Sequence, residues 1–101
     1  MVQGRREIIW TIIARTTRNS IFSYWNNRNK SNLYSKKLFV LFNETLERIA
    51  QFPQTSLATN SSNIRYVLVR DYYLIFEISE LTINVLDIWD TRQNPQNFPI
   101  K

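Results

Sequence analysis

One helical stripe of apolar residues in the middle of the chain constrains the fold more than any other feature. The stripe comprises Tyr34, Leu38, Leu41, Thr45, Ile49 and Phe52, and it is widened by Phe42 and Leu46. These residues recur at intervals of three and four, which is the spacing of one face of an α-helix. Pro53 predicts the end of this helix. Because an amphipathic helix is stable only when its apolar face is covered, a second element must pack on it.

Three β-rich segments later in the chain predict the covering sheet. They are Ile64–Arg70, Tyr73–Ser79 and Ile83–Trp89. The gaps between them have the length of β-hairpin connections, so we expect an antiparallel meander. The stretch before the meander, residues 54–63, is rich in Ser, Thr and Asn and is predicted to be a loop.

The first part of the chain predicts one strand and one further helix. Residues 6–10 are rich in β-formers, and Thr11 is a suitable N-cap for a helix over residues 12–27. A polar, Asn-rich link then leads to the second helix, which Ser31 or Asn32 caps, so the two helices are expected to form an antiparallel hairpin. The apolar face of the first helix is predicted to hold Ile13, Thr17, Ile21, Tyr24 and Trp25, with Arg15, Arg18 and Asn19 facing away.

Together these elements predict an α+β fold of order β-α-α-β-β-β. The helical hairpin packs on one face of a small, mainly antiparallel sheet, and the other face is left partly open. Residues 1–101 are expected to form a single domain. The C-terminal tail, residues 96–101, is expected to be loosely held.

The residues that the chain lacks exclude many classes of enzyme. There is no cysteine and no histidine, and the only glycine is Gly4. Zinc sites, histidine-based triads and glycine-rich phosphate loops are therefore excluded, and we expect neither a metal nor a cofactor. No apolar run reaches the ~18 residues of a membrane span. The N-terminus has no apolar signal region, so a cytoplasmic location is expected.

Charge is distributed unevenly along the chain. Residues 1–50 hold nine Lys and Arg against three Glu, whereas residues 51–101 hold four basic and five acidic side chains. The net charge of +5 favours an anionic partner, either nucleic acid or an acidic peptide. The neighbouring Lys36 and Lys37 form a small basic patch, for which a solvated helix face is the simpler account.

Three arginines mark the ends of the predicted strands. Arg65 begins the first strand of the meander, Arg70 ends it, and Arg92 follows the last strand. We expect Arg70 and Arg92 to converge with Tyr72 or Tyr73 at one edge, where guanidinium groups bind oxyanions or stabilise developing charge. The alternative is that they pair with the nearby Asp71, Asp87 and Asp90. No general base is evident, since a tyrosine acts as one only with a strongly lowered pKa.

The element order and several motifs resemble the RelE/ParE superfamily of type II toxin–antitoxin toxins. The resemblance covers nearly the whole chain. Its motifs include Ile9-Trp10-Thr11, Tyr24-Trp25-Asn26-Asn27-Arg28-Asn29, Ile49-Ala50-Gln51-Phe52-Pro53, Asp71-Tyr72-Tyr73-Leu74-Ile75-Phe76 and Ile88-Trp89-Asp90-Thr91-Arg92.

The resemblance implies a small cytoplasmic bacterial toxin that an antitoxin, encoded beside it, neutralises in a toxin–antitoxin hetero-oligomer. RelE-like members are metal-independent endoribonucleases that cleave mRNA on the ribosome, whereas ParE-like members poison DNA gyrase. A basic toxin that binds an acidic antitoxin segment fits the charge of this chain.

Individual positions favour the ParE-like branch. Arg65 resembles the arginine that opens the same strand in ParE-like members, and Arg92 resembles the arginine after the last strand that contributes to cleavage in RelE-like ribonucleases. The lysine pair of the ribonucleases is missing, and Ile64, Tyr66 and Leu68 occupy that region. No tyrosine follows Arg92, and Phe98 is the nearest aromatic residue there.

The leading hypothesis is therefore a binding-type toxin rather than an enzyme. Its surface for the target and the antitoxin is predicted to include Lys36, Lys37, Arg65, Arg70, Tyr73, Trp89, Asp90 and Arg92. The alternative hypothesis is a RelE-like ribonuclease that uses Arg92, Arg65 and Tyr72. A third hypothesis is a regulatory partner that binds an antitoxin and is itself inert.

Overall fold

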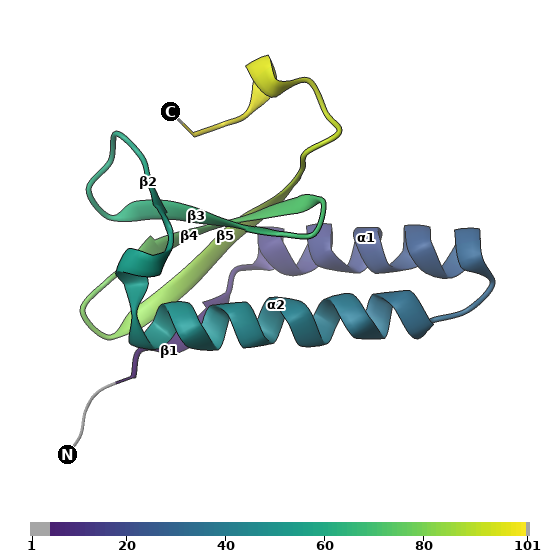
Figure 1. The fold of residues 1–101 in the computed structure, drawn as a ribbon, viewed down its shortest axis with the longest axis horizontal. Helices are drawn as coiled ribbons and strands as arrows, with labels where there is room; N and C mark the ends of the chain where they lie inside the picture. Colours follow the sequence, from purple (N-terminus) through teal and green to yellow (C-terminus); the bar gives the residue numbers. More distant parts are fainter. Residues whose placement is uncertain (1–4, 101) are drawn as a thin grey trace.

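A five-stranded sheet lies between a helical hairpin and the C-terminal segment (Figure 1). The computed structural model describes residues 5–100. Its elements are β1 (Glu7–Trp10), α1 (Ile12–Asn29), α2 (Leu33–Gln51), the 3-10 turn η1 (Pro53–Thr55), β2 (Leu57–Ala58), β3 (Ile64–Val69), β4 (Tyr72–Ile78), β5 (Thr82–Asp90) and the 3-10 turn η2 (Pro95–Asn97). This arrangement confirms the predicted α+β class and the helical hairpin on one face of the sheet.

The sheet has the order β1-β5-β4-β3-β2. The predicted meander is confirmed, since β3, β4 and β5 are antiparallel neighbours, while β1 pairs in parallel with β5. Between β4 and β5 the register shifts at Ile75 and Phe76, which face Asp87 and Val85. Leu86 is thus an extra residue, and such a bulge bends a strand and re-aims the side chains beside it.

The predicted loop over residues 54–63 is wrong in part. Residues 53–55 form η1, and Leu57 and Ala58 add a short edge strand that pairs with Tyr66 and Arg65. The Thr59 hydroxyl group donates to the carbonyl oxygen of Ile64 at 2.6 Å, which fixes the exit of this strand. A strand of two residues is too short to show an alternating pattern. The Ser- and Thr-rich sequence around it therefore indicated a loop.

Helix α1 begins as predicted, and its predicted inner face is confirmed for Ile21 and Trp25, which pack against the core. Thr11 caps it by accepting from the amide of Ala14 at 3.2 Å, and the helix continues to Asn29, two residues beyond the expected end. Ala14 is its one fully buried residue, while Ile13 is 64% exposed and Tyr24 is 49% exposed, contrary to prediction. A small side chain at position 14 allows close packing, which rotates the helix by one position. The inward row is Ala14, Arg18, Ile21, Phe22 and Trp25.

Helix α2 provides five of the fourteen residues of the buried core cluster. Its fully enclosed residues are Leu38, Phe42, Leu46, Ile49 and Ala50. The predicted stripe is therefore correct, but its centre lies one position further along. Leu41 and Thr45 are half-buried, and Phe52, which was expected to be inside, is 52% exposed. Each fully buried Leu, Ile or Phe stabilises the fold by about 1.5–3 kcal/mol, so this row fixes the helix on the sheet. None of the described helices is long and apolar enough to cross a membrane.

The C-terminal segment crosses the sheet face opposite the helices (Figure 1). Phe98 packs against Tyr66, Tyr73 and Trp89 at ring-centroid distances of 5.3, 5.4 and 5.7 Å. The prediction of a loosely held tail is thus wrong at Phe98, and Lys101 lies outside the described residues. The cause is the open face itself, because Tyr73 and Trp89 are direct cross-strand partners and present apolar surface that Phe98 covers.

Candidate functional site

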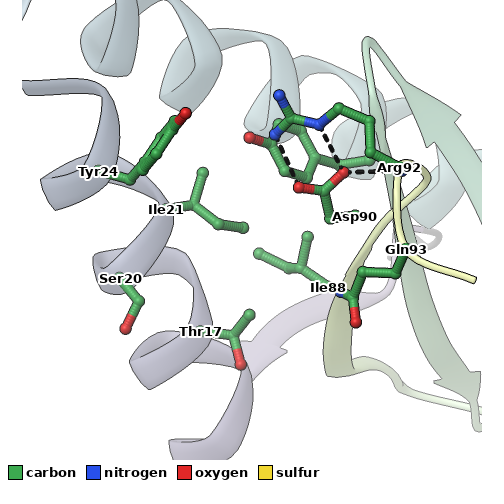
Figure 2. A pocket seen from close by; sticks show the side chains of 9 residues that line it. Thr17, Ser20, Ile21, Tyr24, Ile88, Asp90, Arg92 and Gln93 are labelled. Atoms are coloured by element: carbon green, nitrogen blue, oxygen red, sulfur yellow. Dashed lines mark hydrogen bonds and ion pairs between the residues drawn. The ribbon is translucent and has the colours of Figure 1, made fainter. Parts of the chain in front are cut away.

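A cleft of about 400 Å³ lies between α1 and the end of β5 (Figure 2). Helix α1, the start of β4 and the end of β5 supply its walls. The two strand ends meet there because the antiparallel pairing brings Tyr72 opposite Asp90. Its lining comprises Thr17, Ser20, Ile21, Tyr24, Tyr72, Ile88, Asp90, Arg92 and Gln93. The cleft contains the end of the sequence motif that includes Trp89 and Arg92, so it is the first candidate site.

Arg92 is held in this cleft by its own neighbour. Its Nε and Nη2 atoms donate to the two carboxylate oxygens of Asp90 at 2.9 and 2.7 Å, and its backbone amide donates to the same group at 2.9 Å (Figure 2). These hydrogen bonds raise the pKa of Arg92 and lower the pKa of Asp90. The guanidinium also lies 5.7 Å from the ring centre of Trp25. Asp90 therefore occupies the fork that would otherwise bind an external oxyanion in bidentate fashion.

Tyr72 is a buried structural side chain in the floor of the cleft. It is 1% exposed, and its hydroxyl oxygen accepts from the indole Nε1 of Trp25 at 2.8 Å. Burial is the largest influence on this phenol and raises its pKa. A tyrosine that acts as a general base needs the opposite shift. The geometry therefore gives no support to Tyr72 as a catalytic base.

The three predicted arginines do not form one site. Arg70 lies in the β3–β4 turn with a left-handed φ of 57°, and Thr91 donates to the carbonyl of Asp71 there at 2.8 Å, so Arg70 and Arg92 share one end of the sheet. Arg65 pairs with Phe76 near the other end of β3, and its Nε donates to Ser56 Oγ at 2.7 Å. At ~3.3 Å per strand residue, roughly 13 Å of strand β3 separates position 65 from position 69, which lies beside Arg70.

The remaining predicted residues lie on two further surfaces. Tyr73 and Trp89 are on the sheet face opposite the helices, beneath Phe98. Lys36 and Lys37 are exposed near the start of α2, and Lys36 lines a groove between the two helices. The residues that were predicted to form one surface thus lie in four separate places on the molecule.

The groove between α1 and α2 is a second candidate site that the sequence did not reveal. It measures about 480 Å³ and is mainly apolar. Phe39 and Val40 contribute to it and are 42% and 52% exposed. Its lining comprises Arg18, Asn19, Phe22, Ser35, Lys36, Phe39 and Val40. An exposed apolar groove between two helices is a typical docking surface for an amphipathic protein segment.

Arg18 places an unpaired donor in this groove. Its guanidinium lies 4.8 Å from the ring centre of Trp10 and 5.6 Å from that of Phe39. Its Nε atom is the buried side-chain polar atom within residues 5–100 that has no hydrogen-bond partner. Burial and the nearby charge of Arg15 lower the pKa of Arg18. A buried donor without a partner is destabilising, and the Arg18 side chain also places a positive charge among the residues that line the groove.

The stretch of sequence around Arg18 contains no acidic residue. From residue 8 to residue 43 there is no Asp or Glu, whereas six Lys and Arg occur there, namely Arg15, Arg18, Arg28, Lys30, Lys36 and Lys37. In residues 5–100 the ion pairs are Arg5 with Glu47 and Arg92 with Asp90, and neither involves this stretch. The acid-free stretch is the signal by which the sequence alone would have indicated the helical hairpin as an anion-binding surface.

No protein-family model and no curated protein matches the chain. A solved structure does match: a chain of the chromosomal ParDE toxin–antitoxin system from P. aeruginosa superimposes with a TM-score of 0.69. The match covers 87% of this chain and 98% of the other, at 13% sequence identity. This chain has a ParE-like fold. At this identity the ParE-like fold is what is shared, and it confirms at the level of fold the resemblance that the sequence motifs indicated.

The residues of the cleft and of the groove limit the chemistry that each site can perform. Within residues 5–100, no three His, Cys, Asp or Glu side chains gather as metal ligands. In the cleft, the guanidinium of Arg92 is paired and the phenol of Tyr72 has a raised pKa. In the groove, the walls are mainly apolar, and the buried Nε atom of Arg18 has no hydrogen-bond acceptor.

Proposed function

We propose that the chain is the toxin of a type II toxin–antitoxin module and acts by binding a protein target. Of the targets that the resemblance implies, DNA gyrase is the one we propose. The observation that carries the proposal is the match to a ParDE chain over 87% of the sequence. The absent lysine pair and the paired state of Arg92 support a binding-type toxin over a ribonuclease.

The proposed neutralising partner is an acidic antitoxin segment that occupies the groove between α1 and α2. The apolar walls formed by Phe22, Phe39 and Val40 suit the apolar face of such a segment. Arg18 and Lys36 suit carboxylates beside that face, because guanidinium and ammonium groups form charge-assisted hydrogen bonds with carboxylates. Complementary charge also accelerates association, which suits an inhibitor that must capture its toxin quickly.

The proposed target surface is the end of the sheet that holds Arg70 and Arg92. It lies apart from the groove, so antitoxin and target use different residues of the toxin. A cytoplasmic location is part of the proposal, since both the gyrase and the ribosome act there.

Inducible expression in bacteria tests the proposal. We expect growth arrest together with induction of the DNA-damage response, and no early loss of mRNA. Arg92→Ala is expected to weaken the arrest by about tenfold or more, because charged residues at the centre of an interface are often hot spots. Arg48→Ala is the matched control, since Arg48 is exposed on α2 outside both the cleft and the groove.

Two outcomes of this experiment would contradict the proposal. Rapid, codon-linked cleavage of mRNA would show the RelE-like ribonuclease instead. No arrest at any expression level, with the protein folded and abundant, would indicate the inert regulatory partner.

A further inference from the structure

The C-terminal segment places an aromatic side chain on an aromatic surface. We define the strap as residues 94–100 and the platform as Tyr66, Tyr73 and Trp89. Phe98 of the strap contacts all three platform rings at centroid distances of 5.3–5.7 Å. Tyr66 and Tyr73 also form an edge-to-face pair with each other at 5.1 Å. Four rings from β3, β4, β5 and the strap thus form one cluster outside the main core.

The strap is attached to the sheet by little besides Phe98. Its backbone hydrogen bonds are local, since Asn97 donates to the carbonyl of Asn94 at 2.9 Å and Phe98 donates to that of Pro95 at 3.1 Å. In the described residues, no backbone hydrogen bond joins residues 94–100 to a strand. All strap residues except Phe98 and Ile100 are exposed. Besides Phe98, only Ile100 of the strap is half-buried, beside residues 59–64. A segment with so few buried contacts opens locally at low free energy.

The fit of Phe98 on the platform is incomplete. A cavity of about 270 Å³ remains beside it, lined by Tyr66, Tyr73, Trp89, Thr91, Pro95 and Phe98. The platform therefore has room for a larger apolar group than the one it holds.

The chemistry of the platform fits a protein segment rather than nucleic acid. Its lining includes no Lys or Arg, whereas binding to a phosphate backbone depends on such cations. Leu68, the cross-strand partner of Tyr73, is 53% exposed and extends the apolar surface. Tyrosine and tryptophan are the residue types that most often dominate binding between proteins. Phe98 itself shows the kind of group that the platform accepts.

We propose that the strap is an autoinhibitory cover over a protein-docking surface. The target surface proposed at Arg70 and Arg92 continues onto this face at Thr91, and a segment of the target that presents an aromatic side chain displaces Phe98 and binds to the platform. Because the strap is part of the same chain, it competes at a high effective concentration and lowers the apparent affinity for the target. This inference rests on the proposed toxin function for the identity of the partner, but the cover itself is independent of it.

The first test measures whether Phe98 covers the platform. Phe98→Ala is compared with wild type and with Gln96→Ala, which changes an exposed strap residue and is the matched control. In Phe98→Ala, the fraction of tryptophan fluorescence that acrylamide quenches should rise by up to about one third, because Trp89 is one of three tryptophans. Unchanged quenching, or loss of cooperative thermal unfolding in Phe98→Ala, would overturn the proposal. The second result would show that Phe98 belongs to the core.

The second test measures whether the cover is inhibitory. If the strap is closed in nine of ten molecules, Phe98→Ala should lower the expression needed for growth arrest by about tenfold. Adding Trp89→Ala to Phe98→Ala should remove this gain. A toxicity of Phe98→Ala equal to or below that of wild type would overturn the docking role of the platform. If quenching changes as expected but no variant or wild type arrests growth, the toxin function fails and the cover stands.

Discussion

Arg18 and Arg92 both lie against a tryptophan, but only one of them has a carboxylate partner. Arg92 sits 5.7 Å from the ring centre of Trp25 and is fixed by Asp90. Arg18 sits 4.8 Å from the ring centre of Trp10, and its buried Nε atom has no acceptor. The pKa of Arg92 is raised by its partner, whereas burial lowers the pKa of Arg18.

The difference shows where this molecule has unused binding capacity. A paired guanidinium contributes to its own fold, and a ligand must compete with Asp90 to engage it fully. The buried, unpaired Nε atom of Arg18 destabilises the free protein, and within residues 5–100 no carboxylate competes with a ligand for this guanidinium. The motif at the end of β5 therefore contains Arg92, which already has a carboxylate partner. Arg18, which has none, lies in α1, where no sequence motif marks it.

The largest expected effect comes from removing the support under Arg92. Trp25→Ala deletes the indole that donates to Tyr72 and packs at 4.9 Å on Tyr34. We expect a loss of about 3 kcal/mol in the free energy of unfolding, the lower end for a large aromatic residue because Trp25 is half-buried. Urea denaturation measures this loss. Trp25→Phe should recover more than half of it, and a loss in Trp25→Ala below ~1 kcal/mol would show that the cleft is not built on this residue.

Replacing each arginine by methionine tests the comparison through the sign of the effect. Arg18→Met keeps much of the side-chain volume and removes the unpaired donor, so the protein should become more stable by about 1 kcal/mol. Arg92→Met should be destabilised by about 0.5 kcal/mol, a small value because half of the Arg92 side chain is in solvent. Thermal or urea unfolding measures both variants, with the exposed Arg15→Met as the control. Destabilisation by Arg18→Met would mean that the contacts of its guanidinium with Trp10 and Phe39 outweigh the cost of the unpaired Nε donor.

The smallest expected effect concerns the pH dependence of the Asp90–Arg92 pair. Arg92 lowers the pKa of Asp90 in the folded protein, so this carboxylate stabilises the fold above its unfolded pKa of about 3.9. That contribution is lost as the pH falls through the folded pKa. Asp90→Asn should therefore be less stable than wild type by up to ~1 kcal/mol at pH 7, and the difference should shrink below about pH 4. A difference that is constant from pH 7 to pH 3 would exclude this pair as its cause.

The sequence predicted the elements with strong periodicity or clear end signals. The row from Leu38 to Ile49 and the short gaps of the meander indicated α2 and the sheet, and Thr11 indicated the start of α1. The face of α1 was wrong in part because Ala14, a small residue with little hydrophobic weight, decides how the helix packs. The strand β2 and the position of Phe98 depend on contacts between distant residues, which no local pattern encodes.

The candidate site was predictable only where pairing of strands fixes positions. The meander correctly implied that Arg70 and Arg92 share one end of the sheet, and it also separates Arg65 from them. The alternation of side chains within strands was not used, so Tyr73 and Trp89 were grouped with Arg92 although they face the strap. The groove at Arg18 could not be predicted, because its position depends on which face of α1 packs against the rest of the protein.

Purified components test the proposal that the chain is a toxin that binds DNA gyrase. The chain is added to a gyrase supercoiling reaction and, in parallel, to a translating extract with intact mRNA. We expect inhibition of supercoiling that Arg92→Ala weakens, with the mRNA left whole. Normal supercoiling together with ribosome-dependent mRNA cleavage that Arg92→Ala abolishes would contradict the proposal.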